Sequence, residues 1–467
     1  MISVLWVEDE DVGFDDGLAT LGDLTEQLDI TLVEDSDSAL NELARREFDL
    51  ILCDLMIPSS RGGLDKSIEH GFAVHAAARK LCPGTPLVFL TSQATTKNTK
   101  NHLSSGGTAT IAGIPEFRIV QLAEKDDPSA LLDAVVPLIN GLREHGSHLD
   151  ISATDSTPPT SLQRRVIASY ADVVSANRVE VAQLGGLSGA MVCRADFYDQ
   201  QRALATVVLK LAARELIEDE TGRYHTHVSG QLEIGTFAPQ AVPPLLHGLG
   251  KHAATISKLA DPSSRSLFLL TQKSEADSAR AIQMLSTALA PWDKTRTEAT
   301  VTLTELRRSR VADDYLQQLC PDLLSGEDVE VSIRNTLSHG DLHGENVLVG
   351  DRIQPVLIDF GDVREAPSGT DPIALELSLF AHRDGPARST VWPTVDQLAG
   401  WFDLDLYLRG CPYPDFVRAC RTWAAEVANA RQIASALYVQ SLRKLKHPDA
   451  DHDKAVVLAR AARLHLN

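Results

Sequence analysis

The sequence is short of basic residues and has no long apolar segment. Lys and Arg together number 44 against 64 Asp and Glu, so the formal net charge is −20. Nucleic acids and anionic membranes are polyanions, and this charge argues against nonspecific binding to either of them. No apolar stretch approaches the roughly 18 residues that a membrane-spanning helix needs. We therefore expect neither nucleic acid nor a membrane among the partners.

Cysteine is scarce and scattered. The chain has no CxxC pair and no cysteine–histidine cluster of the kind that binds zinc, so the thiols are expected to be reduced and buried. Residues 1–10 also lack the basic segment and the apolar core of a signal peptide. Together these absences predict a cytoplasmic protein. The six cysteines are Cys53, Cys82, Cys193, Cys320, Cys411 and Cys420.

What the chain does contain is typical of a folded protein with several domains. Hydrophobic residues make up 43 % and charged residues 23 % of the 467 residues, as in globular proteins and unlike disordered ones. Since domains commonly have about 100–200 residues, this length predicts about two to four of them.

Residues 1–145 alternate short apolar runs with amphipathic segments of helical period. This alternation predicts an α/β domain with a doubly wound, five-stranded parallel sheet. The expected strands are Ile2–Val7, Ile30–Val33, Asp49–Cys53, Pro86–Leu90 and Phe117–Leu122. The expected helices cover Phe14–Leu28, Ser38–Arg46, Gly71–Leu81 and Pro128–Leu142.

A polar segment with two prolines, HGSHLDISATDSTPPTS, predicts an interdomain linker over residues 146–162. A second alternating region follows it. Residues 264–324 and the chain from Pro372 onward are largely helical in pattern, with two short strands expected within 347–358. The expected strands before residue 264 are Val179–Leu184, Met191–Arg194, Ala205–Leu209 and Ala253–Leu259.

Carboxylates follow two of the strands expected in the first domain. Glu8 and Asp9 end the first strand, in VLWVEDE, and Asp54 ends the third, in LILCDLMIP. Ligands bind outside the carboxyl ends of the strands in an open parallel sheet. Carboxylates that converge there repel one another unless a hard cation joins them, and Mg²⁺ prefers such oxygen ligands. Thr91 ends the fourth strand and Lys125 follows the fifth, which adds a hydroxyl and an ammonium suited to a phosphoryl group on Asp54.

In this order the acidic pair, the third-strand Asp, the Thr and the Lys resemble response-regulator receiver domains, over residues 1–145. The resemblance implies that Glu8, Asp9 and Asp54 bind Mg²⁺. It implies that Asp54 is phosphorylated by a sensor histidine kinase, and that Thr91 and Lys125 contact the phosphoryl group.

The first domain departs from the receiver pattern at several positions. The segments Pro58–Gly71 and Thr91–Lys125 are longer than the usual loops, and the second contains the stretch SSGGTATIAG. Lys125 is followed by Asp126 where a proline is usual, and Leu122 stands where an aromatic switch residue is common. Phosphorylation is expected, but not the family's aromatic signalling route.

The strongest local signal in the second half is LSHGDLHGENVLV, followed by PVLIDFGDV. Phosphoryl transfer needs a residue that orients or deprotonates the acceptor hydroxyl and oxygen ligands for the Mg²⁺ on the nucleotide. Asp341 is placed for the first role, two residues after His339. Asn346 and Asp359, which ends the next strand, are placed as metal ligands.

The HGDLHGEN form resembles the aminoglycoside phosphotransferase and choline kinase branch of the protein-kinase-like fold. The resemblance implies a bilobal α+β kinase-like domain over residues 163–467. Its amino-terminal lobe would cover about residues 163–262 and its helical carboxy-terminal lobe about residues 263–467. It also implies that the cofactors are ATP and Mg²⁺.

Earlier segments match further parts of that family in order. The segment LGGLSGAMV, with Gly186, Ser188 and Gly189, is expected to cover the nucleotide phosphates, because glycines allow close backbone approach. Lys210 ends TVVLK and is expected to hold the α- and β-phosphates. Glu220 is the expected acid partner of that lysine, with the rivals Glu215 and Glu218 left open.

Several residues near these motifs have structural interpretations. His339 and Asp371, the latter in GTDPIALELSLF, are expected to brace the catalytic loop, and His343 is expected to be solvated. The acids of residues 372–467 are suited to a cationic acceptor, but a solvated acidic surface is the simpler interpretation. These acids are Glu376, Asp384, Asp396, Asp403, Asp405 and Asp415.

The sequence as a whole predicts a response regulator whose output is an ATP- and Mg²⁺-dependent phosphotransferase, acting on a hydroxyl of a small molecule or protein. The alternative is a non-catalytic signalling scaffold, in which the kinase-like half binds nucleotide and a partner protein. A transcription factor is disfavoured, because no basic recognition helix follows the linker.

Overall fold

The computed structural model describes the chain in several stretches that form two compact units. Unit 1 comprises residues 1–218 and 241–258, and unit 2 comprises residues 219–240 and 259–467. The described residues are 1–92, 107–154, 157–184, 190–259, 261, 263–294, 297–447 and 450–466.

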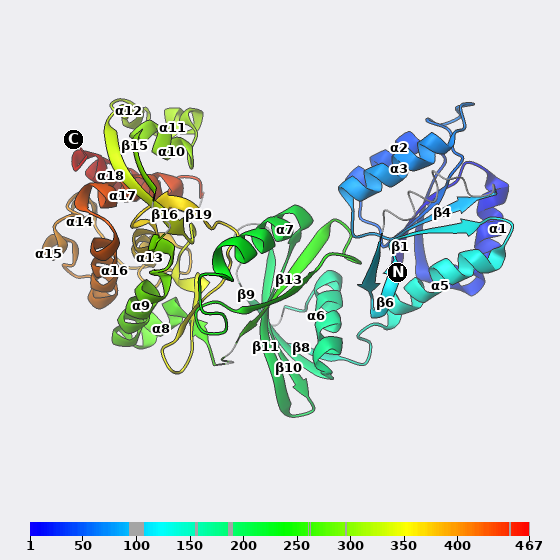
Figure 1. Cartoon of the computed structure of the whole chain (residues 1–467), viewed down its shortest axis with the longest axis horizontal. Coiled ribbons are helices and arrows are strands. Elements are labelled where there is room, and N and C mark those ends of the chain that lie inside the picture. Colours follow the sequence, from blue (N-terminus) through cyan, green and yellow to red (C-terminus); the bar gives the residue numbers. More distant parts are fainter. Residues whose placement is uncertain are drawn as a thin grey trace. The chain divides into compact units, whose positions relative to one another are not determined.

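A five-stranded parallel sheet forms the first domain, within unit 1 (Figure 1). The strands lie in the order β2-β1-β3-β4-β7, which is the doubly wound order of flavodoxin and CheY. The predicted fold class of this domain is therefore confirmed. Its strands are β1 (Ile2–Val7), β2 (Leu28–Val33), β3 (Leu50–Asp54), β4 (Leu87–Thr91) and β7 (Val120–Glu124).

Helices cover both faces of this sheet because successive side chains of a strand point to opposite faces. Val4 and Trp6 join the cluster of α1 and α5, whereas Leu5 and Val7 join the cluster of α2 and α3. Figure 1 shows these helices around the sheet. Side chains cap the amino ends of three of these helices. At α2, for example, the Asp35 side chain accepts a hydrogen bond from the Ser38 amide. The helical elements are α1 (Asp11–Leu21), η1 (Gly22–Gln27), α2 (Ser36–Arg45), α3 (Ile68–Leu81) and α5 (Pro128–Glu144).

The predicted fifth strand, Phe117–Leu122, is wrong in its boundaries. A two-stranded hairpin, β5 (Thr108–Ile111) and β6 (Ile114–Arg118), precedes the fifth strand of the sheet and takes Phe117. Its turn has positive φ at Ala112 (49°) and Gly113 (77°), as a type I′ turn requires. One apolar run in the sequence therefore divides between a hairpin arm and the sheet strand β7.

A six-stranded sheet makes up most of the rest of unit 1, in the order β12-β13-β11-β10-β9-β8. Helix α6 (Ser161–Val174) packs on it through Val166, Ile167 and Tyr170. Strand β8 lies inside the predicted linker and pairs in parallel with β9, so that segment is not wholly a linker. The strands are β8 (Asp150–Ala153), β9 (Arg178–Leu184), β10 (Met191–Asp199), β11 (Arg202–Ala213), β12 (Gln240–Leu245) and β13 (His252–Leu259).

The first domain and the six-stranded sheet contact each other within unit 1. Asp49 accepts a bond from Arg165 at 2.6 Å, and the Gly84 backbone exchanges hydrogen bonds with Gly248 and Gly250 at 2.8 and 3.1 Å. Asp49 and Gly84 precede strands β3 and β4. These contacts therefore lie at the amino ends of the strands, opposite the edge where Asp54 ends β3.

Unit 2 contains two three-stranded sheets, β14-β17-β18 and β15-β16-β19, and many helices (Figure 1). Its strands are β14 (Arg265–Ser266), β15 (Thr297–Thr302), β16 (Glu330–Ser338), β17 (Val347–Val349), β18 (Pro355–Leu357) and β19 (Arg364–Pro367). Helix α7 (Arg214–Arg223) runs from unit 1 into unit 2 and is followed by η2 (Tyr224–Val228). The first group of helical elements in unit 2 is α8 (Leu267–Lys273), α9 (Glu275–Leu289), η3 (Trp292–Lys294), α10 (Leu303–Arg308), α11 (Asp313–Leu319), α12 (Pro321–Leu324) and η4 (Gly344–Asn346). The second group is α13 (Thr370–Ala381), α14 (Val395–Ala399), α15 (Leu404–Tyr407), α16 (Pro414–Val427), α17 (Ala430–Lys444) and α18 (His452–Leu464).

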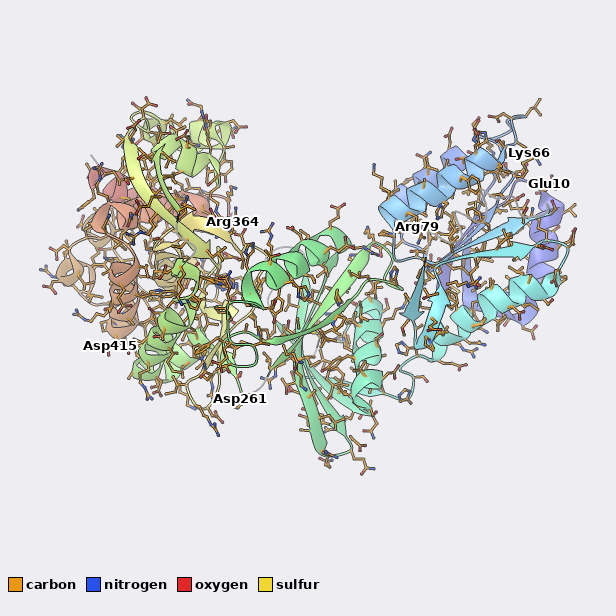
Figure 2. All side chains as sticks on the ribbon, in the orientation of Figure 1. Glu10, Lys66, Arg79, Asp261, Arg364 and Asp415 are labelled. Atoms are coloured by element: carbon orange, nitrogen blue, oxygen red, sulfur yellow. The ribbon has the colours of Figure 1, made fainter. Side chains whose placement is uncertain are left out.

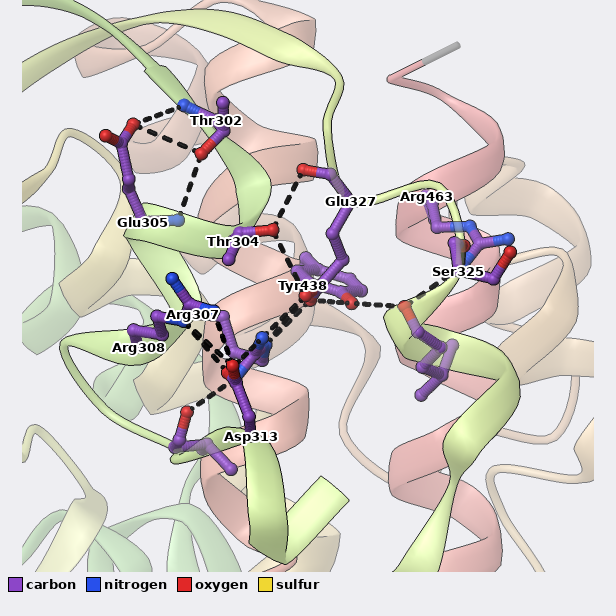
Figure 3. A network of polar contacts seen from close by, with 12 residues as sticks. Thr302, Thr304, Glu305, Arg307, Arg308, Asp313, Ser325, Glu327, Tyr438 and Arg463 are labelled. Carbon is purple, nitrogen blue, oxygen red and sulfur yellow. Dashed lines mark hydrogen bonds and ion pairs between the residues drawn. The ribbon is translucent and has the colours of Figure 1, made fainter. Parts of the chain in front are cut away.

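Figure 3 shows a network of polar contacts in unit 2 that contains a buried ion pair. Arg307 Nε lies 2.7 Å from Glu327 Oε1, and only 1 % and 2 % of the two side chains are exposed. The Tyr438 hydroxyl donates to the same carboxylate at 2.7 Å. Tyr438 lies on α17, so the network joins α10 to α17.

The structure also bears on the predictions about the cysteines, the acidic residues of 372–467 and membrane-spanning helices. All six cysteines are free, and five of them are buried. Glu376 is an exception to the predicted acidic surface, because it is fully buried and accepts a bond from Trp401 at 2.8 Å. No helix in the described part of the chain is both long and apolar enough to cross a bilayer.

Candidate functional sites

The acidic residues of the first domain meet at one edge of the sheet. Strands β1 and β3 are adjacent and parallel, so Glu8, after β1, lies beside Asp54, at the end of β3. Glu8, Asp9 and Asp54 each offer an oxygen, and these oxygens lie within 4.8 Å of one another. The side chains of Glu8 and Asp54 are 0 % and 8 % exposed. This arrangement suits a hard divalent cation, since it gathers carboxylate oxygens in a small volume.

Lys125 enters the same pocket from the end of β7. Its Nζ lies 2.6 Å from Glu8 Oε2 and 2.7 Å from Asp54 Oδ2. Burial raises the pKa of Glu8, and the bond from Lys125 offsets part of that rise. Burial opposes the charge on Lys125, but the bonds to Asp54 and Glu8 outweigh it and raise the pKa of Lys125. Thr91 is buried on the intervening strand, where its carbonyl accepts from the Lys125 amide at 2.8 Å.

Lys66 is a pocket residue that the sequence analysis missed. Its Nζ lies 2.6 Å from Asp9 Oδ2 and 2.7 Å from Glu10 Oε1, and Figure 2 shows Lys66 beside Glu10. Bonds to Asp9 and Glu10 raise the pKa of Lys66. The residue belongs to the long segment Pro58–Gly71, whose extra length was the only signal for it. The insertion thus brings a second ammonium to the acidic cluster.

We expect the substitution Lys66→Met to tighten Mg²⁺ binding by up to about fivefold, because it removes a cation that competes for Asp9. Calorimetric titration of Mg²⁺ into the full chain measures the effect. Lys80→Met, on α3 outside the pocket, is the matched control and should bind Mg²⁺ as the wild type does. Unchanged or weaker binding by the Lys66 variant would show that Lys66 does not compete for the site.

The second site is built on the loop between β16 and β17 in unit 2. His339 is fully buried, and its Nε2 contacts the Ile358 carbonyl at 3.0 Å. Asp371 accepts from the His339 amide at 2.8 Å and from the Ser338 hydroxyl at 2.6 Å. The bracing roles predicted for His339 and Asp371 are confirmed.

The β17–β18 hairpin brings the two predicted metal ligands to one end. Asn346 directly precedes β17, and its carbonyl accepts from the Ile358 amide at 3.1 Å, next to Asp359. The Asn346 amide nitrogen also donates to the Asp341 carbonyl at 2.9 Å. Asp359 has a φ of +64°, a conformation that costs a non-glycine residue about 1–3 kcal/mol and that clusters at functional sites. The hairpin therefore presents Asn346 and Asp359 together beside the loop of Asp341.

Asp341 is partly exposed, with 43 % of its side chain accessible. Arg443 Nη2 lies 3.0 Å from its carboxylate. Burial opposes ionisation of Asp341, but the charges of Arg443 and of the other basic groups around it together outweigh burial and lower the pKa of Asp341. His343 is not solvated as predicted, because its ring stacks on His382 at 4.4 Å between centroids and is 14 % exposed. Burial lowers the pKa of His343 to about 3, so this histidine is neutral near neutral pH.

Gly340 lets the loop of Asp341 approach the segment after Asp359. It has a φ of +78°, and a Cβ there would lie 2.2 Å from the Asp362 carbonyl oxygen. Only glycine fits both requirements. The glycine of HGD thus joins the loop of Asp341 to the loop of Asp359.

The predicted nucleotide-contacting residues are distributed over both units. Lys210 lies on β11 of unit 1, where it pairs with Val192, and Glu220 lies on α7 in unit 2. Of the three acids considered, Glu220 is buried, while Glu215 and Glu218 are exposed and Glu218 pairs with Arg214 at 2.7 Å. The choice of Glu220 remains a prediction. The predicted phosphate-loop residues Gly186, Ser188 and Gly189 lie outside the described residues.

Solved structures similar to this chain match its first domain. A CheY-like response regulator receiver domain protein from Methanospirillum hungatei is 21 % identical and covers 31 % of this chain and 98 % of its own, with a TM-score of 0.23. The receiver domain of a sensor histidine kinase from Pseudomonas aeruginosa, with magnesium in its active-site cleft, is 23 % identical and covers 30 % and 98 %, with a TM-score of 0.23. The BeF3-activated receiver domain of Klebsiella pneumoniae RstA is 24 % identical and covers 29 % and 96 %, with a TM-score of 0.21.

The strand order β2-β1-β3-β4-β7 shows the doubly wound fold of the first domain. No protein-family model matches the chain, and no curated protein matches it.

Proposed function

We propose that the chain is a two-component response regulator whose output is an ATP- and Mg²⁺-dependent phosphotransferase. The acceptor is a hydroxyl of a small molecule or a protein, and phosphorylation of Asp54 regulates the output. The observation that carries the output proposal is the hairpin that sets Asn346 and Asp359 beside the loop of Asp341.

In the first domain, Asp54 is the proposed phosphoacceptor. Its carboxylate oxygen forms the new bond to phosphorus as the bond from phosphorus to the donor, a histidine of a sensor kinase, breaks. Glu8, Asp9 and Asp54 are the oxygen ligands for Mg²⁺, which offsets negative charge on the phosphoryl group. Lys125 lies within hydrogen-bond distance of Asp54, so its ammonium can remain on the phosphorylated side chain. Thr91 is the proposed hydroxyl contact of the phosphoryl group.

In the second half, Asp341 is the proposed residue that accepts the proton of the acceptor hydroxyl. Asn346 and Asp359 are the proposed ligands of the Mg²⁺ that neutralises charge on the nucleotide phosphates. Lys210 and Glu220 are the proposed lysine and acid that bind the nucleotide, and Gly186, Ser188 and Gly189 are the proposed residues of its phosphate loop. The ionised state of Asp341, favoured by Arg443, supports its role as a proton acceptor.

A second candidate function is a signalling scaffold that binds nucleotide without transferring phosphate. The ion pair between Arg443 and Asp341 favours it, because an arginine bonded to the base lowers its basicity. Consumption of Mg-ATP by the full chain, assayed with amino-alcohols, aminoglycosides and candidate proteins, discriminates between the two functions.

The receiver proposal predicts that acetyl phosphate with Mg²⁺ adds one phosphoryl group to the wild-type chain and none to the Asp54→Asn variant. Asp54 is the attacking carboxylate, and acetate is the leaving group. Intact-mass spectrometry detects the adduct. Asp65→Asn, in the exposed loop beside the pocket, is the control and should be modified as the wild type is. No wild-type adduct, or an adduct that persists in Asp54→Asn, would exclude Asp54 as the acceptor.

A further inference from the structure

Three arginines converge on one carboxylate next to the proposed base of unit 2. Arg310 Nη1 and Arg443 Nη2 lie 2.9 and 3.1 Å from Asp362 Oδ2, and Arg364 pairs with the other oxygen of Asp362. They come from separate parts of the chain: Arg310 follows α10, Arg364 begins β19, and Arg443 lies near the end of α17. Their convergence is thus a product of the tertiary fold. We call Arg310, Arg364 and Arg443 the arginine cluster.

The arginine cluster lies at the catalytic loop. Arg443 bonds to Asp341 at 3.0 Å and donates to the Gly340 carbonyl, and Arg310 Nη2 lies 3.4 Å from that same carbonyl. Any acceptor whose hydroxyl reaches Asp341 must therefore lie close to these guanidinium groups. Arg364 is the most accessible member, with 36 % of its side chain exposed, and its position in unit 2 is shown in Figure 2.

The positive charge of the cluster is not balanced within the contacts it makes. Three guanidinium groups share the carboxylates of Asp362 and Asp341. Burial and the neighbouring guanidinium charges lower the pKa of Arg310 and of Arg364 to about 10. This excess of positive charge is local, because the whole chain carries a net charge of −20. An anion bound there would relieve the repulsion among the arginines.

We propose that the acceptor bound over Asp341 carries an anionic group, a phosphate or a carboxylate, which the arginine cluster binds. Planar guanidinium groups bind both anions through paired hydrogen bonds. The proposal rests on the phosphotransferase function proposed above and names its substrate class. It replaces the cationic acceptor that the acids of residues 372–467 suggested, because the charge beside the base is positive.

Two other roles for the arginines predict different results. If they contact the transferred γ-phosphoryl group, a nucleotide analogue that fills the phosphate site should displace an anion bound to them. If they only brace the catalytic loop, their removal should change stability but not the binding of a small anion.

The test is the binding of inorganic phosphate and of acetate to the full chain, measured by ligand NMR with and without saturating Mg²⁺ and a non-hydrolysable ATP analogue. We expect saturable binding of one or both probes that persists with the analogue. Arg364→Gln should weaken it by about tenfold or more, Arg364→Lys should weaken it less, and Arg460→Gln should leave it unchanged. Arg460 is the matched control, because it makes an exposed ion pair with Asp322 elsewhere in unit 2.

The outcomes separate this inference from the proposed function. Preferential binding of phosphate or of acetate identifies the anionic group. Equal binding by Arg364→Gln and Arg460→Gln, no saturable binding, or displacement by the analogue would overturn the anionic acceptor. Failure of the chain to bind the ATP analogue, with anion binding intact and dependent on Arg364, would overturn the phosphotransferase and leave an anion site.

Discussion

The Asp341→Asn substitution is expected to lower phosphotransfer by about 10²–10⁴-fold, because it removes the general base. Mg-ATP binding should stay as in the wild type, since Asn346 and Asp359 are the proposed metal ligands. Asparagine retains an oxygen that can accept from Arg443, so the loop should keep its geometry. Turnover of Mg-ATP and calorimetric titration of Mg-ATP measure the two properties on the same protein.

Asp396→Asn is the matched control for this substitution. It makes the same chemical change at an exposed position in the first turn of α14. It should turn over Mg-ATP at the wild-type rate. Full activity of a folded Asp341→Asn protein would contradict the assignment of Asp341, and no turnover by the wild type with any acceptor would favour the scaffold.

The Glu327→Gln substitution is expected to lower the free energy of unfolding of unit 2 by about 3–5 kcal/mol. It removes the buried one of the two carboxylates that pair with Arg307, whose side chain is 1 % exposed, and leaves Asp313, which is 44 % exposed, as the other partner. Denaturant unfolding followed by tryptophan fluorescence measures the change. Trp292, Trp392, Trp401 and Trp423 report on unit 2, and Trp6 reports on unit 1.

Asp322→Asn is the control for Glu327→Gln. Asp322 pairs with Arg460 at 2.8 Å, and both side chains are more than half exposed. Because solvent screens such pairs, this variant should lose only about 0–1 kcal/mol. Equal losses in the two variants would show that the buried network does not stabilise unit 2 as the contacts in Figure 3 imply.

Sequence patterns predicted those parts of the fold whose signal is local. The apolar run of β1 matched the structure over Ile2–Val7, and the acids at the ends of β1 and β3 met because parallel strands end at one edge. The hairpin β5–β6 and strand β8 were missed, because their short, partly polar runs resemble loops. Strand β15, TEATVT, was missed inside a region of helical pattern, although its threonines and valine favour strands.

The parts of the candidate sites that the sequence did not predict depend on tertiary contacts. Lys66 reaches Asp9 across a long loop, and the arginine cluster gathers side chains more than 50 residues apart in the sequence, such as Arg310 and Arg364. Motif spacing predicts chemistry within one loop or strand end. It does not predict which distant cation completes a site.

The position of Asp54 in unit 1 limits how a change at Asp54 can reach the six-stranded sheet. The contacts of the first domain with the six-stranded sheet, such as Asp49–Arg165, lie at the amino ends of the strands, whereas Asp54 lies at a carboxyl end. With Leu122 in place of an aromatic residue, the route is expected to differ from the aromatic one of receiver domains. A change at Asp54 therefore reaches these contacts only if strand β3 or its neighbours shift.

The most direct test of the central proposal is Mg-ATP turnover by the full chain before and after treatment with acetyl phosphate, in the wild type and in Asp54→Asn. Typical allosteric couplings are about 1–3 kcal/mol, so we predict that turnover of the phosphorylated wild type changes by about five- to 150-fold. The Asp54→Asn variant should not respond. A wild-type adduct on Asp54 that leaves Mg-ATP turnover unchanged would contradict regulation of a phosphotransferase output by this receiver.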